Sequence, residues 1–186
     1  MSSATTAVKP MDADAFLAWG EARAGRWELR DGAAVAMSPE RSAHALTKYA
    51  AQRALTKAIS AGRKPCRVYP DGMAVRVSES VVYEPDGIIV CGPKVPRDAL
   101  SIANPVVVLE VLSPSTASID HGRKLSDYFS LASVAHYLIL DPDRRVVIHH
   151  ARGEGDALVT RVLAQGLLTL DPPGIAVAVE DMFAED

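Results

Sequence analysis

The sequence predicts one α/β domain built around a mixed β-sheet. Residues 105–112, Pro-Val-Val-Val-Leu-Glu-Val-Leu, are apolar on both alternating faces, which is typical of a buried central strand. Helical and extended patterns alternate in the first two thirds of the chain, and period-two patterns dominate from 135 to 170. At 186 residues the chain has about the length of a single domain, so a mixed sheet with an antiparallel C-terminal portion, flanked by helices, is expected.

Two helices and two hairpins are predicted in the first half of the chain. Asp12 is an N-cap candidate, and Gly25 and Gly62 are candidate helix stops. Asp-Gly pairs between alternating segments favour type I′ hairpin turns, since both residues accept a positive φ. The predicted order is a helix over 12–24, a hairpin over 27–37 that turns at Asp31-Gly32, a helix over 40–61, and a hairpin over 64–77 that turns at Pro70-Asp71-Gly72.

The second half of the chain is predicted to form mostly strands. The predicted strands are 86–91, the central strand 105–112, and then 135–140, 146–151, 158–164 and 167–170. A loop is expected over 92–104, a break at Ser113–Thr116 and a helix over 120–132. Residues 1–10, rich in Ser, Thr and Ala, read as a flexible tail, and residues 11–186 as one domain.

Composition narrows the class of protein. A net charge of −3 excludes a broad basic surface that binds nucleic acid by charge alone. A local basic patch is still compatible with this charge. Two cysteines, Cys66 and Cys91, exclude a disulfide framework and fit free thiols in a reducing cytoplasm. No apolar run approaches the roughly 20 residues that span a bilayer. The sequence therefore predicts a cytoplasmic protein that does not insert into membranes.

Glu110 is the most informative residue, because it interrupts the apolar run of the predicted central strand. Removing an unpartnered carboxylate from water costs several kcal/mol. A structural interpretation is that Glu110 pairs with a neighbouring cation or reaches solvent near the end of the strand. The functional interpretation is that it ligates a metal or acts in catalysis.

Asp86 supplies a second carboxylate at the start of the preceding predicted strand, directly after Pro85. If the two strands are neighbours, Asp86 and Glu110 converge on one point. Two converging carboxylates raise the pKa of one of them or bind a divalent ion between them. A ligand set of oxygens alone suits Mg²⁺, Mn²⁺ or Ca²⁺ better than zinc. The alternative is that Asp86 is an ordinary turn residue.

Lys124 lies on the helix predicted after the central strand. Asp120, Lys124 and Tyr128 are spaced i, i+4 and i+8, so they fall near one line on that helix. One interpretation is a surface ion pair between Asp120 and Lys124, worth about 0.3–0.5 kcal/mol. The other is that the Lys124 ammonium points across the end of the central strand toward Glu110.

Taken together, these motifs resemble the Uma2 family of the PD-(D/E)XK restriction-endonuclease-like superfamily. The resemblance spans about residues 11–183, and the stretch from Glu110 to Thr116 is its most specific part. It is carried by Trp27–Gly32, Ser38-Pro39 with His44, Pro85-Asp86, Leu109–Thr116, Asp120 with Lys124 and Tyr128, and His136–Pro142.

The resemblance implies a restriction-endonuclease-like fold and a metal-dependent endonuclease that hydrolyses phosphodiester bonds, with DNA as the first candidate partner and a homodimer as a candidate working form. Asp86 and Glu110 match the acidic pair, which would hold Mg²⁺ or Mn²⁺ together with the backbone carbonyl of Val111. The sequence departs from the superfamily at Leu112, where the motif lysine would stand, and Lys124 is the candidate substitute. Glu28, His44 and Tyr128 are candidate accessory residues.

Other functions stay open at this stage. The missing lysine at position 112 also fits a catalytically inactive binding or regulatory module of the same fold. A metal-free hydrolase that uses the two carboxylates directly is a third hypothesis, which the few aromatic residues disfavour. Two groups of cations could form a local basic rim: Arg23, Arg26 and Arg30 near the first hairpin, and Lys48, Arg53, Lys57, Arg63 and Lys64 on and after the second helix.

Overall fold

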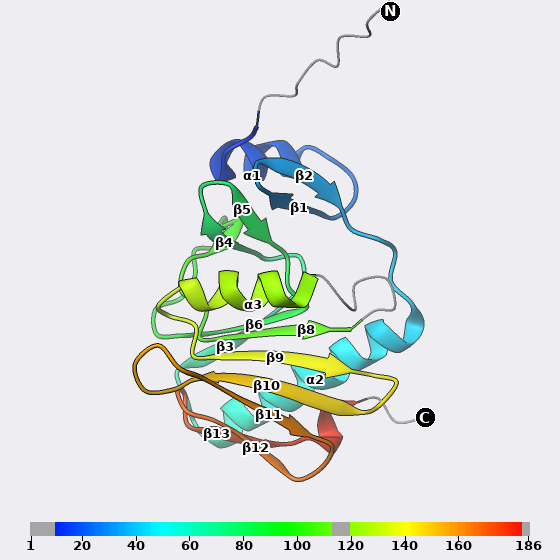
Figure 1. Ribbon diagram of the computed structural model, residues 1–186, viewed down its shortest axis with the longest axis vertical. Coiled ribbons are helices and arrows are strands. Elements are labelled where there is room, and N and C mark those ends of the chain that lie inside the picture. The colour runs from blue at the N-terminus through cyan, green and yellow to red at the C-terminus, as the bar shows by residue number, and fades with distance from the viewer. Residues whose placement is uncertain (1–9, 113–119, 184–186) are drawn as a thin grey trace, which may run out of the picture.

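The computed structural model describes residues 10–112 and 120–183, which form helices around two main β-sheets and a small third sheet (Figure 1). The predicted class, a mixed sheet flanked by helices, is confirmed. The helices are α1 (Ala13–Glu21), α2 (Ser42–Ala61) and α3 (Asp120–Ser130), with a 3₁₀ turn at Glu180–Met182.

The central sheet has six strands in the order β11-β10-β9-β8-β6-β3. Its β8 and β9 are parallel and all its other neighbours are antiparallel, so the sheet is mixed as predicted. Residues 107–111 of β8 are buried along their whole length, which explains the apolar run. The bounds are β3 (Cys66–Pro70), β6 (Gly87–Cys91), β8 (Val107–Val111), β9 (His136–Asp141), β10 (Val146–Arg152) and β11 (Leu158–Leu163).

A second sheet of five strands lies above the central one in Figure 1, in the order β2-β1-β5-β4-β7. Asp31 and Gly32 both have a positive φ in the turn between β1 and β2, as the predicted hairpin requires. The bounds are β1 (Trp27–Arg30), β2 (Ala33–Ala36), β4 (Ala74–Ser78), β5 (Val81–Tyr83) and β7 (Ser101–Ile102). A third, two-stranded sheet pairs β12 (Leu167–Leu170) with β13 (Ile175–Ala178).

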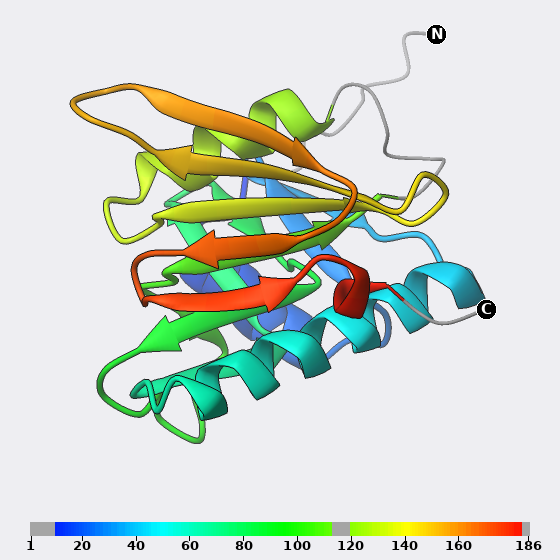
Figure 2. The same ribbon diagram turned by 90° about the horizontal axis from the view of Figure 1, so that it is seen from below.

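Helices α2 and α3 cover opposite faces of the central sheet. Leu55 and Ile59 of α2 share a core with Leu109 of β8, Leu138 of β9 and the β12–β13 pair, and Figure 2 shows α2 running beside β13. Tyr128 of α3 shares a second core with Val108, Tyr137 and Ile139 on the other face. Because β8 has cores on both sides, any polar side chain on it is withdrawn from water.

Three expectations from the sequence are wrong. The segment 92–104, expected as a loop, contains the short strand β7 (Ser101–Ile102). Residues 64–77 do not form a hairpin: β3 pairs with β6 in the central sheet, whereas β4 pairs with β5 and β7 in the other sheet. The turn at Pro70–Gly72 therefore carries the chain from one sheet to the other. Cys66 and Cys91 are not free thiols but form a disulfide, because the register of β3 and β6 places them directly opposite each other.

The chain returns to the central sheet at Glu84-Pro85-Asp86, between β5 and β6. This crossing places the end of the upper sheet, the start of β6 and the end of β8 near one another. The predicted tail over 1–10 falls almost wholly on residues outside the described part of the chain, as does the predicted break at Ser113–Thr116.

Candidate active site

Glu110 is buried beneath α3 and has two hydrogen-bond donors from that helix. Its Oε1 accepts from Lys124 Nζ at 2.8 Å and from the Tyr128 hydroxyl at 2.8 Å. The i, i+4 spacing of Lys124 and Tyr128 brings both donors to one oxygen. This explains how a carboxylate persists in an otherwise apolar strand, and it shows that the Lys124 ammonium points toward Glu110 as one of the two interpretations predicted.

Glu28 of β1 completes the environment of Lys124. Its Oε1 accepts from Lys124 Nζ at 2.9 Å, and its Oε2 accepts from Arg30 on the same strand. The Glu28 and Lys124 side chains are 2% and 7% exposed, so this is a buried ion pair rather than a surface one. The side chain of Asp120, the other predicted partner of Lys124, lies outside what the structure describes.

Asp86 lies next to Glu110 across the β6–β8 ladder. Gly87 pairs with Leu109, so Asp86, which directly precedes β6, lies beside the Glu110 end of β8, and its charge acts on Glu110. Asp86 Oδ2 accepts from the backbone N–H of Val111 at 2.8 Å, which fixes the carboxylate against β8. The predicted pairing of the two strands is therefore observed.

Helix α2 approaches Asp86 from its other side. His44 Nε2 lies 3.3 Å and Lys48 Nζ 3.9 Å from Asp86 Oδ1, and Gln52 Nε2 donates to the Asp86 backbone carbonyl at 2.6 Å. These three residues are spaced i, i+4 and i+8, a signal in the sequence that could have identified Lys48 and Gln52 alongside His44. The sequence analysis named Lys48 only as part of a basic rim and did not identify Gln52.

A group with the donor types of a metal site also forms here. Single donor atoms of Glu40, His44 and Asp86 lie within 4.8 Å of one another, and among the described residues this is the one group of three or more His, Cys, Asp or Glu side chains arranged so closely. Glu110 is not part of it. Asp86 therefore stands between Glu110 on one side and His44 with Glu40 on the other.

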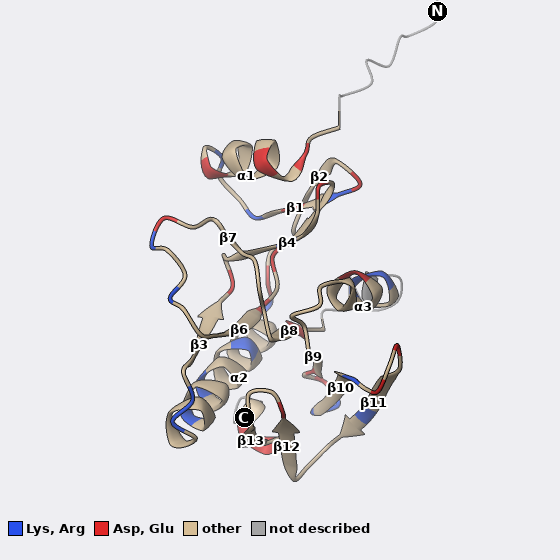
Figure 3. Ribbon diagram, turned by 90° about the vertical axis from the view of Figure 1, so that its left-hand side faces the viewer, with Lys and Arg blue, Asp and Glu red and all other residues tan. Residues whose placement is uncertain are grey.

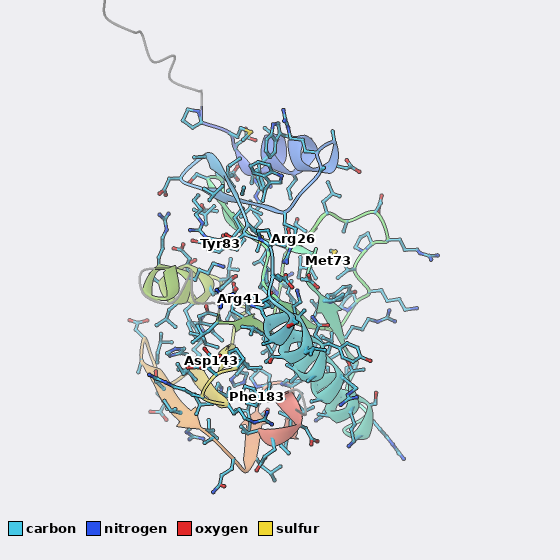
Figure 4. The ribbon with its side chains drawn as sticks, turned by 90° about the vertical axis from the view of Figure 1, so that its right-hand side faces the viewer. Arg26, Arg41, Met73, Tyr83, Asp143 and Phe183 are labelled. Atoms are coloured by element: carbon cyan, nitrogen blue, oxygen red, sulfur yellow. A yellow bond between two sulfur atoms is a disulfide. The ribbon has the colours of Figure 1, made fainter. Side chains whose placement is uncertain are left out.

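Ion pairs between cations and acidic side chains border the site. Lys48 Nζ donates to Glu40 at 2.6 Å and to Asp71 at 2.9 Å, while Arg26 binds Glu84 at 2.6 Å and also pairs with Glu40. Figure 4 shows Arg26 between the upper sheet and the start of α2. Lys48 and Arg26, both predicted for a basic rim, are instead engaged by carboxylates.

The electrostatics of the acidic residues differ. Burial raises the pKa of Glu110 to about 7, because the Lys124 charge offsets desolvation only in part and Asp86 and Glu28 add negative charge. Burial also acts to raise the pKa of Asp86, but His44, the Val111 N–H and Lys48 outweigh it and the pKa is lowered. Glu110 and Glu28 raise the pKa of Lys124 despite its burial, so Lys124 stays charged.

The structure thus brings Asp86, Glu110, Lys124, Tyr128, Glu28 and His44 into one continuous set of contacts. The arrangement combines two neighbouring carboxylates with a buried ammonium, and this is the class of site that metal-dependent hydrolases use for phosphate esters.

Comparisons with known proteins identify the family and the fold. The chain belongs to the Uma2 family, described as "Putative restriction endonuclease", whose profile matches residues 13–180. A relative in Synechocystis, an uncharacterised protein, is 25% identical over 170 residues, which cover 90% of this chain and 88% of the relative.

A solved structure shares the fold. It is the crystal structure of a protein from Anabaena variabilis described as "a putative nuclease belonging to DUF820", with a TM-score of 0.71 at 15% identity, covering 94% of this chain and 98% of that one. No helix in the described residues is both long and apolar enough to cross a membrane.

Proposed function

We propose that this protein is a divalent-metal-dependent endonuclease that hydrolyses phosphodiester bonds, with DNA as its substrate. The observation that carries the proposal is a pair of carboxylates, Asp86 directly before β6 and Glu110 on the adjacent β8, with the ammonium of Lys124 donating a hydrogen bond to Glu110. Membership of a family described as restriction endonucleases supports the same reaction.

The donor groups fit a hard divalent cation. Oδ1 of Asp86, the second oxygen of Glu110 and the backbone carbonyl of Val111 would supply the oxygen ligands that Mg²⁺ and Mn²⁺ prefer. Glu110 Oε1 is occupied by Lys124 and Tyr128, which leaves Oε2 as its ligand atom. A pKa of about 7 for Glu110 also fits, because a cation beside it favours the ionised form. A bound ion supplies Lewis acidity toward phosphate and lowers the pKa of water.

The residues of this chain would then have distinct tasks. Lys124 stays charged and would stabilise the negative charge that develops on the phosphate oxygens. Tyr128 and Glu28 hold Lys124 and Glu110 in position through the hydrogen bonds described above. His44 is placed to ligate the ion or to hydrogen-bond a phosphate oxygen from the α2 side. Lys124 thus takes the place of the motif lysine, because position 112 carries Leu instead.

The alternative, an inactive module of the same fold, is favoured by one observation. Lys124 is held by two carboxylates rather than free, and Lys48 neutralises Glu40 and Asp71, so the described residues already provide cations near the acidic side chains. In that case the buried ion pairs would be structural.

The test is nicking of a supercoiled plasmid with Mg²⁺ or Mn²⁺. Wild type should cleave, EDTA should abolish cleavage, and Glu110→Gln should lower the rate by at least about a hundredfold, since charge at the reacting centre contributes this much. The exposed Glu154→Gln is the matched control and should cleave like wild type. Equal cleavage by wild type and Glu110→Gln would rule out the mechanism.

A further inference from the structure

The cations of this chain are distributed unevenly. Although the net charge is −3, residues 41–70 contain seven Lys and Arg and no Asp or Glu. This segment forms α2, the turn after it and β3, and Figure 3 shows Lys and Arg but no acidic residue on α2. The seven are Arg41, Lys48, Arg53, Lys57, Arg63, Lys64 and Arg67.

Five of these cations are exposed and take part in no ion pair among the described residues: Arg41, Arg53, Lys57, Arg63 and Arg67. Three of the five lie along the middle of α2 and on the adjacent β3. Arg53 and Lys57 of α2 and Arg67 of β3 are exposed, and no carboxylate of the described residues lies within ion-pair distance of them. Lys48 differs, because it is turned inward to Glu40 and Asp71. Unpaired cations of one sign on a single face create a positive potential that attracts polyanions.

An exposed aromatic ring accompanies these cations. Tyr49 is 63% exposed, and the Arg53 guanidinium lies over its ring, 5.8 Å from the centroid. Tyr49, Arg53, Thr56 and Ser60 fall along the outer side of α2. Beside them a hollow of about 320 Å³ is lined from α2 by Thr56 and Ser60 and from β3 by Arg67 and Tyr69.

This surface joins the candidate active site. His44 and Gln52, which contact Asp86, lie on the neighbouring side of the same helix. Helix α2 therefore carries exposed cations on one side and the contacts to the buried Asp86 on the adjacent side. Cations next to an exposed aromatic ring are the combination that binds unpaired nucleotides, because phosphates contact the cations while a base stacks on the ring.

We propose that Tyr49, Arg53, Lys57 and Arg67, here called the basic face, bind a single-stranded segment of nucleic acid. The three cations contact its phosphates and Tyr49 stacks on an unpaired base. The proposal rests on the proposed nuclease function, to which it adds the route of the substrate and a preference for unpaired nucleotides.

The test is fluorescence anisotropy with a labelled single-stranded DNA of about 15 nucleotides and the matching duplex. EDTA is present, so binding is measured apart from cleavage. Wild type is compared with the triple variant Arg53→Glu/Lys57→Glu/Arg67→Glu and with Tyr49→Ala. The control is Arg161→Glu on β11, a charge reversal outside the basic face. Circular dichroism checks folding, and a triple Gln variant replaces the triple Glu variant if the latter does not fold.

The triple variant should weaken single-strand binding by more than about tenfold and reduce the slope of log K against log salt by about 2, since each phosphate contact contributes about 0.7. Tyr49→Ala should weaken single-strand binding by about five- to a hundredfold and leave duplex binding and the salt slope unchanged. Arg161→Glu should bind like wild type.

Unchanged affinity and salt slope in the triple variant would overturn the basic face as the binding surface, even if the protein cleaves DNA. Duplex binding as tight as single-strand binding, with no effect of Tyr49→Ala, would overturn the preference for unpaired nucleotides. Loss of binding in the triple variant, with no cleavage by wild type under any metal, would support the basic face while the nuclease function failed.

Discussion

Lys124 is the buried cation that two carboxylates of the candidate active site share, because its single ammonium lies between Glu28 and Glu110. In a buried site each partner depends on the others: a cation between two carboxylates is stabilised by both, and its removal leaves two like charges together. This dependence distinguishes Lys124 from an exposed lysine.

Replacement of Lys124 by Met should therefore reduce stability strongly. Glu28 and Glu110 would lose their shared cation, so the free energy of unfolding should fall by about 3–5 kcal/mol at pH 7. Urea unfolding followed by circular dichroism measures it, with Lys94→Met at an exposed loop position as the control. A change below about 1 kcal/mol would show that the buried ion pairs do not hold the site together.

A second buried pair lies outside the candidate active site and makes the stability of the protein depend on pH. His136 Nδ1 and His149 Nε2 are 2.9 Å apart, and both side chains are buried. Burial, with the charges of His136, Arg161 and His150, lowers the pKa of His149 to about 4. Burial lowers the pKa of His136 as well, despite the opposing influence of Asp171 and Pro172.

The contribution of His149 to stability should accordingly rise with pH between about 4 and 6.5, whereas the raised pKa of Glu110 contributes in the opposite direction. In that window the unfolded chain binds a proton at His149 that the folded chain does not, so protonation favours unfolding. The loss at the acidic end should be on the order of 2 kcal/mol, measured by urea unfolding at several pH values. Wild type should therefore gain stability relative to His149→Gln as the pH rises from about 4 to 6.5, and a difference between the two proteins that does not change with pH would assign the effect to other groups.

At the scale of the elements, the Cys66–Cys91 disulfide joins the edge strand β3 to β6, the strand that follows Asp86. Its two cysteines are 25 residues apart in the sequence, so the bond limits the conformations of the unfolded chain. Reduction by dithiothreitol should lower the free energy of unfolding by about 3 kcal/mol. The double variant Cys66→Ser/Cys91→Ser should unfold identically with and without reductant, and a wild type insensitive to reductant would contradict the bond.

Element by element, the sequence predicted most local structure because periodicity is a local property. The hairpin at Asp31-Gly32, the long helix ending at Gly62 and the buried β8 are all observed. Pairing is not local, which is why residues 64–77 were wrongly joined as a hairpin: a turn signal at Asp71-Gly72 marks a change of direction but not which strand comes next. The Cys66–Cys91 bond was missed for the same reason, since it depends on the register of β3 against β6.

The residues of the candidate active site were predicted from departures from the local sequence pattern rather than from periodicity. Glu110 was detectable because a carboxylate in an apolar run violates the pattern of its own strand, and Asp86 because it begins the neighbouring strand. Arg30, Lys48 and Gln52 carry no such violation, and their roles depend on how the upper sheet and α2 lie against the central sheet.

For the whole molecule, the site lies where two sheets and two helices meet, and no single element contains it. Glu28 comes from the upper sheet, Asp86 and Glu110 from the central sheet, Lys124 from α3 and His44 from α2. The acid-free segment at 41–70 gives one side of this junction a positive surface. Carboxylates at the centre and cations along one approach suit a reaction on a polyanion.

The central claim, that Asp86 and Glu110 form a divalent-ion site, is tested most directly by calorimetric titration of the protein with Mn²⁺. Wild type should bind the ion, and Asp86→Asn and Glu110→Gln should each weaken binding by at least about tenfold, because each removes a charged ligand. Glu154→Gln should bind as tightly as wild type. Equal affinity in wild type, Asp86→Asn and Glu110→Gln would contradict the account.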